Sequence, residues 1–347
     1  MKNLEIRKLS FESALHVPES LWFPATFTAL DSWTQLAREI YGSDTHRFEA
    51  VQGDEVIGIL ALTHVRHPIF GNYLATSPFG SYGGFAFSSI QVRDMLLNEA
   101  QKLADDLGVQ YVVLRFMEED NIPPSLWMQN PIYSTYMIDL PSNPEDLMKG
   151  FGHQHRKHTR QALRKGFKVQ FGQLELLDET YEALARSMHE LGSPYHSKEY
   201  LRRMAVLLGD KLEFVVIKDA KNSLVGSAVL VYHGLTATNL HANILHKYRS
   251  EYAGECLYWS ILERYCQKGM QRCDMGRSLN GSGNETFKFK WKPRKVPLAY
   301  WYYLPKGGDI PELNQKSPKF QLAIWIWKRM PAFLVRALGP HLIRGIA

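Results

Sequence analysis

The strongest constraint on the fold of this chain is a helix–strand unit that the sequence contains twice. Residues 88–107 have the apolar spacing of a long amphipathic helix, a glycine follows them, and residues 110–116 have the pattern of an apolar strand. The same succession returns as a helix pattern over 251–268, a glycine, and a strand pattern over 272–275. Because 347 residues are enough for two domains, the repeat predicts two copies of one module.

The other elements extend this repeat over most of the chain. The second half has the order β-α-α-β-β-β-α-β-α-β, with strands at 167–172, 212–218, 224–232, 236–244, 272–275 and 297–304 and helices at 178–191, 197–208, 251–268 and 284–291. The first half repeats the order, with strands at 4–9, 47–52, 56–65, 72–77, 110–116 and 134–140 and helical patterns that include 32–41 and 88–107.

This order resembles the GNAT fold, in which a splayed mixed sheet is flanked by helices. We therefore expect a mixed α/β (α+β) fold class with two tandem GNAT-like modules, at 1–145 and 167–312. A basic helical connector at 146–166 joins them, and a basic amphipathic tail covers 313–347.

Several broad classes of protein are disfavoured by the composition. No segment has the ~18 consecutive apolar residues of a membrane-spanning helix, and the first residues lack the apolar stretch of a signal peptide. We therefore expect a cytoplasmic protein. The cysteines, Cys256, Cys266 and Cys273, have no CxxC spacing, which favours buried thiols over a catalytic cysteine. The histidines lack HExxH or similar spacing, so we expect no metal.

Six short motifs, in this order, connect the chain to a known family. They are SYGG from Ser81, HRKHTRQALRKGF from His155, LGSP from Leu191, DMGRS from Asp274, FKFKW from Phe287 and PLAY from Pro297. The set resembles the FemAB-like proteins of exosortase and PEP-CTERM exopolysaccharide clusters, and the related BioF2-like acetyltransferase domains. The resemblance implies transfer of an aminoacyl, peptidyl or other acyl unit to an amine on a cell-envelope or exopolysaccharide precursor.

Such a transfer needs a cation and a base. Negative charge develops on the carbonyl oxygen when an amine attacks, and the amine must lose a proton. The resemblance implies that Lys288, which follows Phe287, is the cation; the alternative is a solvated helix lysine, as we expect for Lys290. Asp274 and His189 are the candidate bases, although Asp274 could instead pair with Arg277 and His189 could be structural.

The candidate substrate-binding residues lie in loops next to strands or glycines. They are Tyr82, Gly83, Gly84, Arg115, Tyr195, Arg277, Ser278 and Trp291. Loops at the carboxyl ends of strands commonly build sites on open sheets, and an arginine there can hold a phosphate or carboxylate. Glycines let backbone N–H groups approach a ligand, but the same glycines could serve a tight turn that needs positive φ.

The acyl donor stays open between aminoacyl-tRNA and acyl-CoA or an acyl carrier, and we expect no tightly bound cofactor. The stretch 249–254 stands where GNAT enzymes have their glycine-rich pyrophosphate loop, yet it has one glycine, and Glu251 adds a negative charge. This departure weighs against ordinary acetyl-CoA binding.

A basic run over 153–168 has six Lys or Arg residues and no acidic residue. Arg156, Arg160 and Arg164 recur every four residues and so share one side of a helix. The run could be a solvated connector face, or it could contact tRNA phosphates, an anionic glycan or a lipid headgroup. Because no aromatic side chain interrupts the stripe, any contact with tRNA would be with its backbone.

The tail from residue 313 onward has six Lys or Arg residues and no acidic residue, within a chain of net charge +6. Its pattern predicts a helix that begins at Ser317–Pro318 and a second one from Pro331. Such apolar, basic helices can lie on an anionic membrane at the inner face of the cytoplasmic membrane, or they can dock on the protein's own surface.

Three functions follow from these observations. The first is a FemAB-like transferase that acts on an envelope or exopolysaccharide precursor. The second is an N-acyltransferase that uses acyl-CoA or a carrier protein. The third is a non-catalytic module that binds glycan or scaffolds a membrane assembly.

Overall fold

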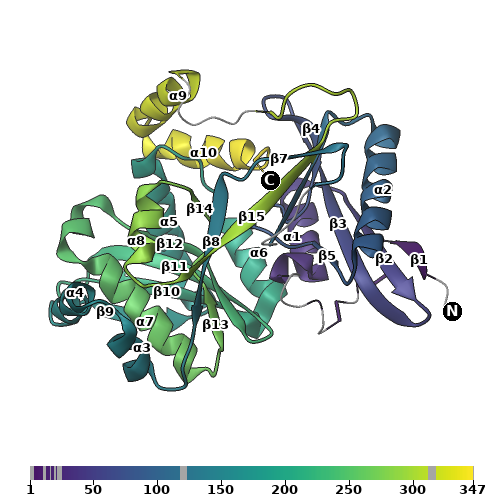
Figure 1. The fold of residues 1–347 in the computed structure, drawn as a ribbon. Helices are drawn as coiled ribbons and strands as arrows, with labels where there is room; N and C mark the ends of the chain where they lie inside the picture. The colour runs from purple at the N-terminus through teal and green to yellow at the C-terminus, as the bar shows by residue number, and fades with distance from the viewer. Residues whose placement is uncertain are drawn as a thin grey trace. The chain divides into compact units, whose positions relative to one another are not determined.

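A computed structural model describes residues 4–10, 13–15, 17–18, 21, 26–117, 123–311 and 318–346, without the side chains of Lys319 and Phe320. The predicted helix start at Ser317 lies outside these residues. The chain divides into two compact units (Figure 1). Unit 1 contains Met1–Ser134, Val296–Glu312 and Arg344–Ala347, and unit 2 contains Thr135–Lys295 and Leu313–Ile343.

Unit 1 is built on a mixed sheet. Its strands, in spatial order, are β1 (Leu4–Leu9), β2 (Thr45–Gln52), β3 (Glu55–His67), β4 (Gly71–Ala75), β6 (Tyr111–Met117) and β15 (Arg294–Tyr303). Neighbours are antiparallel except β4 and β6, which are parallel. Two short strands, β5 (Phe85–Phe87) and β7 (Trp127–Gln129), pair with β3 and β15.

The described residues of unit 1 also form the α-helices α1 (Asp31–Tyr41) and α2 (Ile90–Leu107). The Ser89 hydroxyl caps α2 by accepting a hydrogen bond from the Val92 N–H, and Gly108 ends it at φ 58°. The apolar face of α2 packs on the sheet. Gly58 of β3 permits this approach, because a Cβ there would lie 2.5 Å from a methyl carbon of Val92.

Unit 2 has its own mixed sheet. The strands, in spatial order, are β8 (Tyr133–Asp139), β13 (Arg272–Asp274), β12 (Thr236–Ile244), β11 (Leu224–His233), β10 (Leu212–Lys218) and β9 (Lys168–Gly172). Only β12 and β13 are parallel. A short strand, β14 (Ser278–Leu279), pairs with β8.

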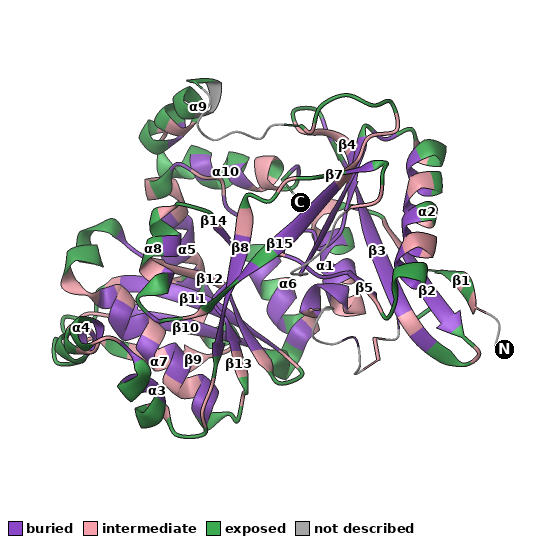
Figure 2. Cartoon of the chain, viewed as in Figure 1, coloured by how far each residue is buried: buried purple, intermediate pink, exposed green. Residues whose placement is uncertain are grey.

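Eight helices surround this sheet among the residues that the structure describes. They are α3 (Pro144–Gly150), α4 (His153–Leu163), α5 (Leu177–Leu191), α6 (Lys198–Leu208), α7 (Ala253–Gln267), α8 (Gly283–Phe289), α9 (Pro318–Arg329) and α10 (Ala332–Ile343). Helix α5 packs against β11 and β12, and α3 and α4 pack on α7. Figure 2 shows the buried residues gathered on the strands and on the inner sides of these helices.

The two parallel strands of unit 2 part after three residue pairs. β12 and β13 pair from Thr236 opposite Arg272 to Thr238 opposite Asp274. Beyond these pairs β12 continues to Ile244, whereas β13 ends at Asp274 and is followed by Gly276, which has φ 79°. In unit 1, β4 and β6 also pair over three residues. The predicted mixed, splayed sheet with flanking helices is therefore confirmed in each unit.

Two strands belong to a different sheet from the one that the sequence order predicted. We predicted the strand 134–140 in the first module and the strand 297–304 in the second. Instead, β8 pairs with β13 in unit 2 and β15 pairs with β6 in unit 1. These strands lack a local hairpin turn, so their partners depend on which sheet edge is open, which sequence order does not encode. The predicted connector 146–166 forms α3 and α4, which both belong to unit 2.

No helix among the described residues is both long and apolar enough to cross a membrane. The three cysteines are buried free thiols. Burial raises the pKa of Cys256 to about 11 and raises the pKa of Cys273 well above its usual value. Neutral, inaccessible thiols are poor nucleophiles, which argues against a catalytic cysteine.

Candidate functional site

Lys288 lies on α8, and its side chain is buried. The Ser282 hydroxyl caps this helix by accepting a hydrogen bond from the Glu285 N–H. The Lys288 Nζ donates hydrogen bonds to the carbonyl oxygens of Gly276, at 2.5 Å, and Arg277, at 3.2 Å. With 5% exposure it is not the solvated lysine of the alternative interpretation. Lys290 does lie at the surface, where it pairs with Glu255.

Burial also changes the charge state of Lys288. It lowers the pKa of this lysine to about 8, and the Asp274 carboxylate opposes that shift. The Nζ lies 5.1 Å from the centroid of the Tyr136 ring, a distance at which a cation is attracted to an aromatic face. The buried ammonium group is thus held by two backbone carbonyl oxygens and by the face of one aromatic ring.

Asp274 belongs to the same cluster as Lys288. One oxygen of its buried carboxylate accepts hydrogen bonds from the Thr135 hydroxyl and from the Gly276 N–H, the latter at 2.8 Å. Asp274 therefore fixes the turn whose carbonyl groups receive Lys288. The Arg277 side chain is exposed at this turn, so the structure brings three predicted site residues together where β12 and β13 part.

A second buried carboxylate, that of Glu285, lies in the first turn of α8 and was not predicted from the sequence. Glu285 accepts hydrogen bonds from the Tyr136 hydroxyl and from Lys295, both at 2.7 Å, and from the Gly281 N–H. The hydrogen bond from Lys295 is the main reason why the pKa of Glu285 falls to about 2. The pattern Ser282-x-x-Glu285, a capping-box signature, could have revealed the role of Glu285; nothing local in the sequence points to Tyr136.

Ser278 and Trp291 are buried near Lys288 in the chain. Within the described part of the chain, no hydrogen-bond partner is found for the Ser278 hydroxyl or for the Trp291 indole N–H. Trp291 follows α8 directly, and its ring packs edge-on against His155 of α4, with centroids 4.3 Å apart. Trp291 therefore packs in the core beside the Lys288 helix, and the Ser278 hydroxyl is a buried polar group; the substrate-binding roles of both residues stay predictions.

His189 and Tyr195 are grouped with the C-terminal helices. The His189 Nε2 lies 3.0 Å from the Trp327 carbonyl oxygen of α9. Tyr195 is buried, its ring contacts the His241 ring edge-on at 5.5 Å, and Gly339 of α10 lies against its backbone. The roles of these two residues as base and cleft residue stay predictions.

The residues predicted in the first module meet at one turn of unit 1. Gly83 and Gly84 have φ 112° and 68°, and the Gly83 N–H donates to the Arg115 carbonyl oxygen at 3.0 Å. The hydroxyls of Thr26 and Thr28 donate to the Tyr82 carbonyl oxygen at 2.8 and 2.9 Å.

Steric contacts explain the glycine. A Cβ on Gly83 would lie 2.3 Å from the Thr26 hydroxyl oxygen, so the tight-turn interpretation accounts for this position. The Arg115 guanidinium lies over the Tyr300 ring, 5.6 Å from its centroid.

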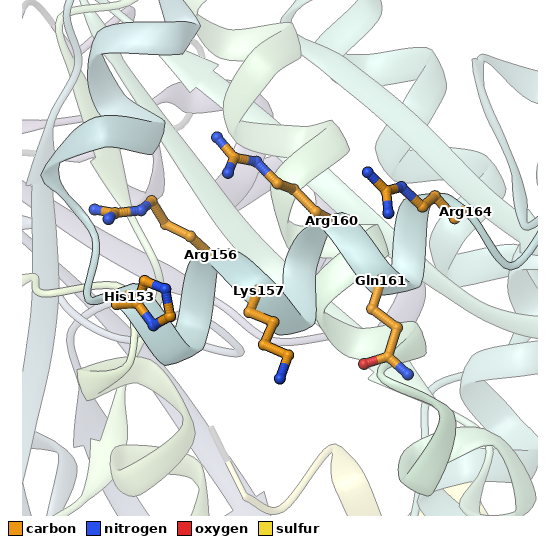
Figure 3. A pocket seen from close by; sticks show the side chains of 6 residues that line it. All are labelled: His153, Arg156, Lys157, Arg160, Gln161 and Arg164. Carbon is orange, nitrogen blue, oxygen red and sulfur yellow. The ribbon is translucent and has the colours of Figure 1, made fainter.

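The basic run forms an exposed surface on α4. A surface cavity of ≈ 400 Å³ is lined by His153, Arg156, Lys157, Arg160, Gln161 and Arg164. Figure 3 shows the guanidinium groups of Arg156, Arg160 and Arg164 following one another along one side of the helix, as the four-residue spacing predicted. We call this set the α4 surface.

The α7 N-terminus, where a pyrophosphate would bind in a GNAT enzyme, is occupied by acidic groups. Glu251 precedes the helix and pairs with Lys165 at 3.5 Å, and Glu255 lies in its first turn. Carboxylates already interact with the positive end of the helix dipole, so a diphosphate would meet negative charge there.

Comparisons with known proteins agree with this architecture. The sequence of residues 153–289 matches the acetyltransferase (GNAT) domain family. FemX has a similar structure, with a TM-score of 0.65 and 15% identity over 87% of this chain and 95% of that one. A tandem GNAT protein from the clavulanic acid biosynthesis pathway has a TM-score of 0.54 and 12% identity, covering 88% of this chain and 100% of that one.

A third similar structure is that of L-PGS from Bacillus licheniformis, with a TM-score of 0.51 and 13% identity over 79% of this chain and 85% of that one. No curated protein sequence matches this chain. Residues 153–289 therefore match a GNAT-type acetyltransferase domain by sequence, and the whole chain has the fold of FemX and of the tandem GNAT protein. The fold thus agrees with the tandem GNAT architecture that the resemblance to FemAB-like proteins implied.

Proposed function

We propose that this protein is a FemAB-like transferase that moves an aminoacyl, peptidyl or other acyl unit to an amine on a cell-envelope or exopolysaccharide precursor, in the cytoplasm. The observation that carries this proposal is the buried ammonium of Lys288, which is held where β12 and β13 part. A cation that is fixed before the reaction and shielded from water stabilises a developing oxyanion more strongly than a solvated one.

The chemistry would proceed as follows. The amine nitrogen of the acceptor attacks the acyl carbon, and the electron pair of the carbonyl moves to its oxygen. Lys288 has three N–H donors, of which two are engaged by Gly276 and Arg277, so the third can meet this oxygen. The new C–N bond forms, the C–O or C–S bond to the carrier breaks, and the carrier oxygen or sulfur leaves. The amine proton passes to a base, for which Asp274 stands in the same cluster.

The α4 surface supports an aminoacyl-tRNA as the donor. Lys157, Arg160 and Arg164 are exposed cations on a single helix. Such a row suits the regularly spaced phosphates of a nucleic-acid backbone. No Phe, Tyr or Trp side chain is among the residues that line the cavity, so we propose backbone contact through Arg156, Arg160 and Arg164 without base stacking.

An N-acyltransferase that uses acyl-CoA or an acyl carrier is the second candidate. The match of residues 153–289 to an acetyltransferase domain favours it. The carboxylates at the start of α7 weigh against it for ordinary acetyl-CoA.

Both donors can be compared in one experiment. The purified protein is incubated with radiolabelled aminoacyl-tRNA or with radiolabelled acyl-CoA, together with envelope precursors extracted from bacterial cells, and the label transferred to an amide is counted. We expect transfer from aminoacyl-tRNA, a loss of at least about 100-fold in Lys288→Met, and near-normal transfer in the matched surface variant Lys290→Met.

Transfer from acyl-CoA alone would favour the second candidate. Equal transfer by Lys288→Met and the unaltered protein would contradict the assigned role of Lys288. If neither donor supports transfer while Lys288→Met and Arg277→Ala leave the cellular phenotype intact, the protein is the non-catalytic scaffold.

A further inference from the structure

The C-terminal helices are fixed to unit 2 along one side. Trp327 of α9 is buried, and its indole N–H donates to the Ser193 carbonyl oxygen at 3.1 Å. Gly339 of α10 packs so closely on Tyr195 that a Cβ would lie 2.8 Å from its carbonyl oxygen. Arg336 pairs with Glu182 of α5 at 2.6 Å. The tail therefore docks on the protein's own surface, which was one of its two predicted roles, and this leaves its opposite side to be explained.

Both helices also carry exposed apolar side chains. On α9, Leu322, Trp325 and Ile326 have the spacing of one helix face, and Trp325 is 53% exposed. On α10 the exposed apolar residues are Phe333, Leu334 and Leu338. Figure 2 shows both helices largely in the colour of exposed residues.

Single exposed apolar residues are ordinary on protein surfaces, but six within 17 residues are a concentration that favours a partner surface. We call this set the α9–α10 face.

The charges around the α9–α10 face have one sign. Lys328 and Arg329 are exposed at the end of α9, and no acidic residue occurs between residue 313 and the end of the chain. The Arg329 guanidinium lies over the Trp325 ring, 4.0 Å from its centroid, so a cation and an aromatic ring sit together at the edge of the face.

Charge separates the possible partners. A second copy of this chain would place the same cations against each other, and like charges repel across an interface. An anionic lipid surface attracts them and accepts the apolar side chains between its headgroups. An apolar face edged by Lys, Arg and Trp is the composition of a helix that lies in the plane of a membrane interface.

We propose that the α9–α10 face docks onto an anionic membrane leaflet, with both helices lying on its surface. Because the other side of each helix is already packed on unit 2, docking needs no refolding of the tail. This binding does not depend on any transfer reaction, so it can be tested apart from the proposed function.

The test measures how the full-length protein distributes onto sedimented vesicles. One set of vesicles is phosphatidylcholine alone, and the other contains a minority of phosphatidylglycerol. We expect binding to the anionic vesicles that weakens in high salt, because the cations are exposed.

Two variants address the two parts of the face. Trp325→Ser with Phe333→Ser removes apolar contacts and should lower the partition coefficient at least about tenfold. Lys328→Glu with Arg329→Glu should do the same through charge.

Matched controls show whether the position of the substitution matters. Ile69→Ser removes a side chain of unit 1 that is 68% exposed, close to the 71% of Phe333. Lys211→Glu with Lys221→Glu reverses two exposed cations of unit 2 outside the tail. We expect the partition coefficient of both controls to stay within about twofold of that of the unaltered protein. The circular dichroism spectrum should be unchanged in every variant.

Two results would overturn the proposal. One is an absence of binding to anionic vesicles, or binding that the face variants and the controls reduce equally. The other is a concentration-dependent dimer, seen by light scattering, that the face variants dissociate while vesicle binding is absent. In that case the face joins two copies of the chain.

Discussion

Lys288 should make the stability of the protein rise with pH in a range where few proteins gain stability. Burial lowers the pKa of this lysine from its usual 10.5 to about 8. In the unfolded chain the lysine therefore still binds its proton between these two values, whereas in the folded protein it has lost it. The state that binds more protons is favoured as pH falls, so folding is favoured as pH rises through this range.

The size of the effect follows from the two pKa values. The difference between a pKa of 10.5 and one of 8 corresponds to about 3 kcal/mol of destabilisation of the folded protein. At pH 7 the whole of this cost is present, because Lys288 is protonated in both the folded and the unfolded state. Most of this cost, about 2 kcal/mol, should disappear between pH 7 and about pH 10. Lys288→Met removes the titrating group and keeps a side chain of similar length.

The assay is chemical denaturation of the unaltered protein and of Lys288→Met at several pH values in this range. Taking the difference between the two free energies of unfolding cancels the other titrating groups. We expect the difference to move by about 2 kcal/mol in favour of the unaltered protein as pH rises. A difference that stays constant, or moves the other way, would refute the depressed pKa of Lys288.

Three further predictions concern residues around the candidate site. Burial lowers the pKa of His155 to about 4. Between pH 6.5 and 4 the unfolded chain therefore binds a proton at His155 more readily than the folded protein does, and acid destabilises the fold. Between pH 7 and 5, His155→Phe should lose about 2 kcal/mol less free energy of unfolding than the unaltered protein, measured by thermal melting. Gly83→Ala should cost at least about 2 kcal/mol, since φ is 112° and Thr26 leaves no room for a Cβ, whereas Gly108→Ala, with open space around it, should cost about 1 kcal/mol. Glu285→Gln should lower stability by about 1–2 kcal/mol and should also slow transfer, because it loosens the helix that carries Lys288.

These predictions fail in distinct ways. An unchanged acid profile in His155→Phe would mean that the His155 ring is solvated or paired in solution. Equal costs for the two glycine substitutions would mean that the Thr26 contact relaxes freely. Full activity in a destabilised Glu285→Gln would separate stability from the alignment of α8.

Local sequence signals located most of the helices correctly because helix ends depend on nearby residues. Gly108 ends α2 as expected, and α2 begins at Ile90, two residues after the predicted start. The Asn143 side chain caps α3 by accepting a hydrogen bond from the Glu145 N–H. The segment predicted as a helical connector consists of two helices, α3 and α4, with Phe151–Gly152 between them.

The candidate site was predictable only in its residue types. The Phe287-Lys288 motif contains the lysine that is buried, and the DMGRS motif contains the turn whose carbonyl groups bind it; the catalytic role of Lys288 stays a prediction. The Tyr136 ring and hydroxyl could not be found in this way, because Tyr136 comes from a strand far away in the sequence.

By itself, the sequence determined the order of elements, the repeat of one module and the basic stripe of α4, since each depends on spacings within a few turns of chain. Only the tertiary structure decided that β8 and β15 join the sheets of unit 2 and unit 1, and that Lys288 is buried with a lowered pKa. The physical reason is that strand pairing and desolvation depend on groups that the fold brings together from distant parts of the chain, and a local pattern contains no record of them.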